Sequence, residues 1–222
     1  MLLQFLSLLI SDPIAAIVQI LVLLAAIIAA VTIHEFSHAL ISHSLGDLTA
    51  RRLGRLTLNP LAHLDPMGSV LFLIAGFGWG KPVPVNPYFF RRTEPRLGMS
   101  LVSLAGPISN IMTAFVAALM VKVLINQIDQ GILIPTRLLL IFVNISILLA
   151  VFNFVPIPPL DGFKVAVGLL PRKLAQHYSK LEQFGPMPLF ALLVAELAIP
   201  GVNIFGNIIG KPVAIIMRAF LQ

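Results

Sequence analysis

The sequence predicts an all-α, multi-pass membrane protein with about four transmembrane helices. Of its 222 residues, 58% are hydrophobic and only 11% are charged, whereas a soluble domain usually carries about 25% charged residues. Several apolar runs reach the roughly 20 residues that a helix needs to cross a bilayer. No polar stretch is long enough for a second globular domain. We therefore expect one membrane-embedded unit over residues 1–222, with a core at 14–170 and a C-terminal helical region at 186–222.

The first expected span runs from Ile14 to about His43. Asp12 can cap this helix, and Pro13 suits its first turn. The residues before it, 1–10, are expected to form an interfacial segment or an extension of the helix. Three further spans are expected, the last of them weakened by Pro200-Gly201: Leu97–Ile125, Ile134–Val155 and Pro188–Ile208.

The apolar run Met67–Phe77 is only half the length of a span. It leads into a glycine-rich cluster at 76–80 and the stretch Lys81–Pro87, where Val alternates with Pro. Proline lacks the N–H that a ladder needs, so this stretch can form an edge strand but not a central one. We expect a re-entrant segment with a short strand near residues 67–90.

Basic residues predict the orientation in the membrane. They follow the first helix, the short apolar run and the third helix: Arg51, Arg52 and Arg55; Lys81, Arg91, Arg92 and Arg96; Lys164, Arg172, Lys173 and Lys180. A re-entrant run places all three clusters on one side, which the positive-inside rule makes cytoplasmic, with the N-terminus outside. The basic residues form no stripe interleaved with aromatics, so the net charge of +6 does not indicate a nucleic-acid partner.

The first helix carries the motif His34-Glu35-Phe36-Ser37-His38. Four residues advance a helix by about 400°, so both imidazoles lie on one face and can chelate one zinc ion. Glu35 can then act as the base for a water molecule. A charged residue at the centre of a spanning helix costs about 2.5–3.5 kcal/mol, and a bound cation compensates for such groups. The alternative is a buried His/Glu hydrogen-bond cluster without metal.

Asp161 is the candidate for a third ligand. The chain has no cysteine, so His, Asp or Glu must complete the three protein ligands of a catalytic zinc site. Prolines end the third long helix near Val155, and the chain turns at Asp161-Gly162 on the side of the membrane where His38 is expected. Alternatively, Asp161 only caps the helix expected near Phe163–Leu170.

Together these motifs resemble the site-2 protease family of intramembrane zinc metalloproteases. The resemblance covers residues 14–170 and rests on HEFSH at 34–38 and NFVPIPPLDG at 153–162, with further matches at 59–68, 78–86 and 105–110. No insert can hold a PDZ or cystathionine-synthase-like domain, as in the minimal-core type. The resemblance implies that Glu35 is the general acid/base, that Asn153 lies near the substrate backbone, and that three residues bind zinc: His34, His38 and Asp161.

Other candidates are His63, Val83 and Val85. His63 either donates to the oxyanion or orients a ligand, or it has a purely structural role. Val83 and Val85 either form an edge to which an unwound substrate adds as a strand, or only pack in a loop.

The expected function is zinc-dependent hydrolysis of peptide bonds in or near transmembrane segments, as in regulated intramembrane proteolysis. The expected partners are membrane lipid and transmembrane protein or peptide substrates, and the site is expected toward the cytoplasmic side of the cell membrane. Two alternatives remain: a divalent-metal transporter or channel, and an inactive scaffold. Transport sites tend to lie near the bilayer midplane, and a scaffold has no need of Glu35, which is not a ligand.

Overall fold

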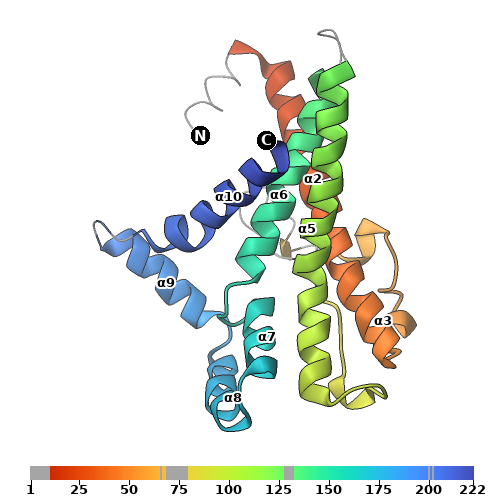
Figure 1. Ribbon diagram of the computed structural model, residues 1–222, viewed down its shortest axis with the longest axis vertical. Coiled ribbons are helices and arrows are strands. Elements are labelled where there is room, and N and C mark those ends of the chain that lie inside the picture. The colour runs from red at the N-terminus through yellow and green to blue at the C-terminus, as the bar shows by residue number, and fades with distance from the viewer. Residues whose placement is uncertain (1–10, 66, 69–79, 128–132, 200, 202) are drawn as a thin grey trace.

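Three long helices lie side by side and form the body of the protein. The computed structural model describes residues 11–65, 67–68, 80–127, 133–199, 201 and 203–222. The helices run roughly along its long axis (Figure 1): α2 (Pro13–Leu45), α5 (Pro95–Gln127) and α6 (Leu133–Asn153). Each contains a segment long and apolar enough to cross a membrane. These helices agree with the predicted all-α, multi-pass character.

Local sequence explains where α2 begins and ends. Asp12 accepts a hydrogen bond from the Ala15 backbone N–H at 3.0 Å, and Pro13 occupies the first helical position. At the other end, Gly46 has a φ of +110°, a left-handed conformation that glycine adopts without strain. The predicted start of the first helix is therefore confirmed, and its predicted end near His43 falls two residues short of Leu45.

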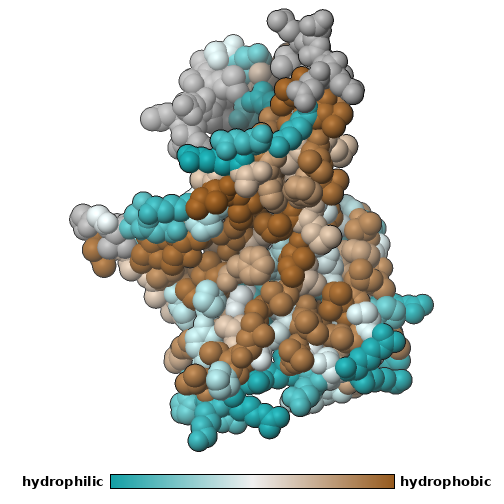
Figure 2. All heavy atoms as spheres, viewed as in Figure 1, coloured by the Kyte–Doolittle hydropathy of each residue, from teal (hydrophilic) through white to brown (hydrophobic). Residues whose placement is uncertain are grey.

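Small residues bring α5 and α6 close together. Ala114, Ala117 and Ala118 of α5 are almost completely buried in one cluster with Val143 and Ile147 of α6. Small side chains allow helix backbones to approach closely where lipid removes the usual hydrophobic driving force. The outward faces remain apolar, and hydrophobic residues dominate the middle of the molecule in Figure 2. This surface suits contact with lipid.

The predicted fourth span, Pro188–Ile208, is wrong as one continuous helix. Helix α9 (Met187–Ala198) has 12 residues, about 18 Å, which is shorter than the roughly 30 Å of a bilayer core. Gly201 has a φ of +84°, and a left-handed residue cannot continue a right-handed helix. The chain continues through the π-helical turn η4 (Gly206–Gly210) into α10 (Lys211–Leu221), which packs against α6 and α5.

The predicted re-entrant strand segment is not seen as a strand in the residues that the structure describes there. Much of it, 69–79, lies outside those residues, as does the N-terminal segment 1–10. One isolated antiparallel bridge joins Leu64, just after the 3-10 turn η1 (Pro60–Ala62), to Gly80. Residues 81–86 have no regular secondary structure and lead into the 3-10 turn η2 (Pro87–Phe89). Prolines at 82, 84 and 87 remove ladder donors and explain the missing ladder.

The basic clusters meet at one end of the helices, where hydrophilic residues gather at the bottom of Figure 2. The Arg91 backbone N–H donates to the carbonyl of Leu45, at the end of α2, at 2.9 Å. Arg96 donates to the Leu170 carbonyl at 2.9 Å, which brings the third cluster alongside the second. Four short elements lie in or near these clusters: α3 (Thr49–Arg52), α7 (Asp161–Leu169), α8 (Arg172–Ser179) and η3 (Lys180–Phe184).

Candidate metal centre

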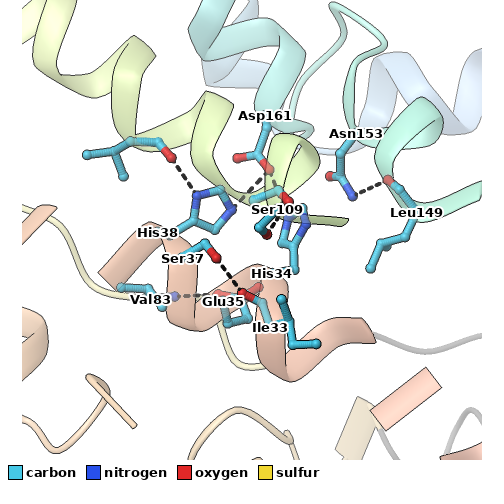
Figure 3. A network of polar contacts seen from close by, with 12 residues as sticks. Ile33, His34, Glu35, Ser37, His38, Val83, Ser109, Leu149, Asn153 and Asp161 are labelled. Atoms are coloured by element: carbon cyan, nitrogen blue, oxygen red, sulfur yellow. Dashed lines mark hydrogen bonds and ion pairs between the residues drawn. The ribbon is translucent and has the colours of Figure 1, made fainter. Parts of the chain in front are cut away.

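The structure brings the three predicted ligands together between α2 and α7 (Figure 3). An Asp161 carboxylate oxygen, Oδ2, lies 3.0 Å from His34 Nε2 and 3.1 Å from His38 Nε2. One ligand atom from each residue lies within 4.8 Å of the others. Both histidines are buried, with 5% and 8% of their surface exposed. The arrangement is compact enough for one ion to contact all three side chains.

The chain after α6 delivers Asp161 to the cluster. Helix α6 ends at Asn153, and α7 begins at Asp161 with Leu160 as its N-cap residue. The Asp161 carboxylate points at the two imidazoles, so the capping role considered from the sequence does not describe its contacts. A Cβ on Gly162 would lie 2.3 Å from the Phe154 carbonyl oxygen. Only glycine fits this tight return of the chain.

Hydrogen bonding sets the tautomer of His38. Its Nδ1 lies 2.7 Å from the Val102 carbonyl oxygen, which can only accept, so Nδ1 carries the proton. In the neutral imidazole, Nε2 then presents a lone pair to Asp161. A lone pair and a carboxylate oxygen 3.1 Å apart repel each other unless a cation or a proton lies between them. The donor set therefore fits a bound metal ion.

Gly106 of α5 leaves room for the imidazoles. A Cβ built on Gly106 would lie 2.5 Å from His38 Nε2 and 2.6 Å from His34 Cε1. Both distances are far below ordinary contact, so any other residue would displace the rings. Sequence reasoning did not assign this role to Gly106. The sequence marked Gly106 through the match at 105–110 and, with Pro107, as a general packing and kink feature, because the specific need for glycine arises from a helix packed against the site.

A cavity of about 160 Å³ lies beside the ligand cluster. Glu35 lines it, and its Oε2 accepts a hydrogen bond from the Val83 backbone N–H at 3.1 Å. The predicted substrate residues Asn153, Val83 and Val85 also line the cavity. Asn153 itself donates to the Leu149 carbonyl at 3.0 Å. The lining further includes residues that the sequence did not mark for the site: Pro82, Met99, Val102, Ser103, Pro159 and Lys164.

His63 does not join the cluster. Its side chain is completely buried, and its Nε2 donates to the Thr57 carbonyl at 2.8 Å. Its own carbonyl accepts from the Lys81 backbone N–H at 2.8 Å. It is absent from the residues that line the cavity. The side chain and carbonyl of His63 therefore contact the backbone of Thr57 and Lys81 and not the ligand cluster.

Comparison with known proteins decides which family this site belongs to. Over 180 residues the chain is 38% identical to "Putative zinc metalloprotease YwhC" of Bacillus subtilis (strain 168), covering 79% of this chain and 81% of that protein. The chain belongs to the site-2 protease family. The protease is also 30% identical over 190 residues to "Putative zinc metalloprotease Rip2" of Mycobacterium tuberculosis, covering 83% and 71% of the two chains. No family model and no solved structure matches.

The donor set of the protease agrees with the metal named in its relatives. Zinc accepts imidazole nitrogen and carboxylate oxygen, and catalytic sites often combine two histidines with one carboxylate and an open position. His34, His38 and Asp161 provide this combination without a thiolate. The cofactor expected from the sequence, one zinc ion, is thus supported by the donor chemistry and by the relatives.

Proposed function

We propose that this protein is an intramembrane zinc endopeptidase that cleaves peptide bonds in or near the transmembrane segments of other membrane proteins. The observation that carries the proposal is the cluster of two imidazoles and one carboxylate, with Glu35 on the wall of the adjoining cavity. The cluster is built partly on α2, a helix long and apolar enough to span a bilayer. A substrate embedded in lipid can therefore reach the same depth as the site.

Each polar residue then has a distinct role. His34, His38 and Asp161 hold the zinc ion, which when bound supplies Lewis-acid activation of water and of the scissile carbonyl. Glu35 lies outside the ligand cluster, so its carboxylate is free to accept a proton from the attacking water. It then returns that proton to the leaving amine. The Val83 N–H holds Oε2 of this carboxylate in place from one side.

The cavity wall accounts for substrate binding. A helical peptide bond is shielded by its own hydrogen bonds, so the substrate has to unwind before water can attack it. Val83 and Val85 lie on the wall, in a stretch where the structure describes no strand ladder. The unwound substrate adds to this edge through backbone hydrogen bonds, and Asn153, which lines the same cavity, contacts the substrate backbone.

The proposed topology places the three basic clusters and the mouth of the site on the cytoplasmic side, with the N-terminus outside. Contacts between Arg91 and Leu45 and between Arg96 and Leu170 support a common side for these clusters. Arg137 donates to Gln19 near the opposite end of α2, where few basic residues are found. His63 supports the active-site loop and does not stabilise the oxyanion.

A cleavage assay on purified protein tests the function. A test transmembrane substrate in detergent is incubated with the wild-type protein, with chelator, with chelator followed by zinc, and with Glu35→Gln. We expect cleavage that chelator abolishes, zinc restores and Glu35→Gln eliminates. The exposed Glu182→Gln is the matched control and should cleave normally.

The same preparations separate the alternatives. Zinc uptake into proteoliposomes, with no cleavage of any substrate tested, would favour a transporter and contradict the protease. Zinc binding with neither cleavage nor transport would identify a scaffold. Equal cleavage by the wild-type protein and Glu35→Gln would show a contaminating protease.

A further inference from the structure

The segment Lys81–Asn86 includes residues that line the cavity. A buried arginine, Arg55, hydrogen-bonds to the first residues of this segment. Arg55 is only 5% exposed. Its guanidinium donates from Nη1 to the Ala62 carbonyl and from Nη2 to the carbonyls of Lys81 and Pro82, the last at 3.1 Å. One planar group thus joins the loop after α3 to the start of the segment.

A buried aspartate, Asp47, hydrogen-bonds to the last residue of the segment. Asp47, which has no exposed surface, accepts from the Asn86 backbone N–H at 2.8 Å through Oδ2. The same oxygen accepts from the Ser42 hydroxyl at 3.1 Å, and Oδ1 accepts from the Thr49 backbone N–H at 2.9 Å. Burial raises the pKa of Asp47, but these hydrogen bonds outweigh it and hold the pKa below its usual range. The carboxylate is therefore ionised.

Between these two anchors the segment contacts the catalytic machinery. The Val83 N–H donates to Glu35 Oε2, and Val83 and Val85 line the cavity. Neither Arg55 nor Asp47 lines the cavity itself. Both residues belong to the chain that directly follows α2, so they connect the segment to the helix that bears Glu35.

Burying two charges in this way is costly unless each is fully hydrogen-bonded. Among the residues that the structure describes, neither forms an ion pair within 4.0 Å. Arg55 hydrogen-bonds only to carbonyls, leaves its buried Nε without a partner and interacts electrostatically with Glu35; Asp47 hydrogen-bonds only to amides and hydroxyls. Apolar residues would hold a loop at less cost. The charged groups add directional hydrogen bonds, because a guanidinium fork and a carboxylate fix the position of the backbone groups they bind.

We propose that Arg55 and Asp47 are positioning residues that hold the segment Lys81–Asn86 at a set distance from Glu35. They thereby align both the Val83 N–H with the carboxylate of Glu35 and the edge at Val83 and Val85 with the scissile bond. This inference rests on the proposed function. Arg55 reaches these carbonyls from two nitrogens held in one plane, whereas a lysine ammonium donates from a single nitrogen and does not fix their relative positions in this way.

The absence of cysteine from the chain allows a direct test. A single Lys81→Cys change provides a spin-label site at an exposed side chain whose own carbonyl accepts from Arg55. In this background, Arg55→Lys keeps the charge and loses the fork. Arg52→Lys, three residues earlier on an exposed position, makes the same chemical change and is the control. Label mobility, zinc content, thermal midpoint and cleavage kinetics are measured for each protein.

We expect the label to become more mobile in Arg55→Lys and to remain unchanged in Arg52→Lys. The zinc content should stay at one ion per chain, while kcat/KM falls by about 10- to 100-fold, because a displacement of about 1 Å at a reacting centre has an effect of that size. Asp47→Asn acts from the other end of the segment and should show the same combination. This second variant tests the inference if Arg55→Lys fails to fold.

Three outcomes would overturn the inference. If the wild-type protein cleaves its substrate and Arg55→Lys matches Arg52→Lys in mobility and kcat/KM, the positioning role fails while the protease function stands. If Arg55→Lys and Asp47→Asn lose zinc together with activity, these residues only support the fold. If the wild-type protein cleaves nothing, the proposed function fails and this inference fails with it.

Discussion

Gly106→Ala is the sharpest test of the metal centre. The added Cβ would lie 2.5 Å from His38 Nε2 and 2.6 Å from His34 Cε1. Ordinary contacts between such atoms are roughly 3.5 Å, so the rings or α5 must move apart by about 1 Å. Zinc sites tolerate ligand displacements of about 0.2 Å. We therefore expect zinc affinity to fall by about 100-fold or more, which corresponds to about 3 kcal/mol.

Competition with a chromophoric chelator measures this affinity, and a substrate assay measures cleavage. Replacing glycine by alanine inside a helix ordinarily stabilises it by about 1 kcal/mol, so a change in helix propensity cannot account for the expected loss. Gly210→Ala is the control, since the nearest atom to its added Cβ is 4.0 Å away. Zinc affinity within threefold of wild type, with normal cleavage by Gly106→Ala, would refute the packing argument.

Two further predictions concern the loops around the site. The pKa of Asp47 is held below its usual range, so its stabilising effect is complete above the unfolded pKa of about 3.9 and is lost as the pH falls through the folded value. The thermal midpoint should therefore fall more steeply below about pH 4 in the wild-type protein than in Asp47→Asn, and parallel pH profiles would contradict this. Gly162→Ala places a Cβ 2.3 Å from the Phe154 carbonyl oxygen. It should destabilise the protein by about 1–3 kcal/mol in chemical denaturation and weaken zinc binding, and unchanged values for both would show that the turn relaxes freely.

Sequence reasoning predicted the long helices because their signals are local. The Asp12-Pro13 start and the apolar runs of α2, α5 and α6 depend on neighbouring residues and on composition. The fourth span was wrong as a continuous helix, because an apolar average does not register the left-handed turn at Gly201. His63 lies in a polar, proline-flanked motif that resembles an active-site segment, yet its contacts are with the backbone of its own loop and of Lys81.

The sequence by itself determined that lipid is the main solvent of this protein, that its long apolar runs are helical, and that His34 and His38 share one face of a helix. Composition and the helical period are sufficient for these conclusions. Only the tertiary structure decided that Asp161, 127 residues from His34, lies 3.0 Å from its ring. It alone revealed the gap at Gly106 and the contacts of Arg55 and Asp47, because these depend on how separate elements approach one another in space.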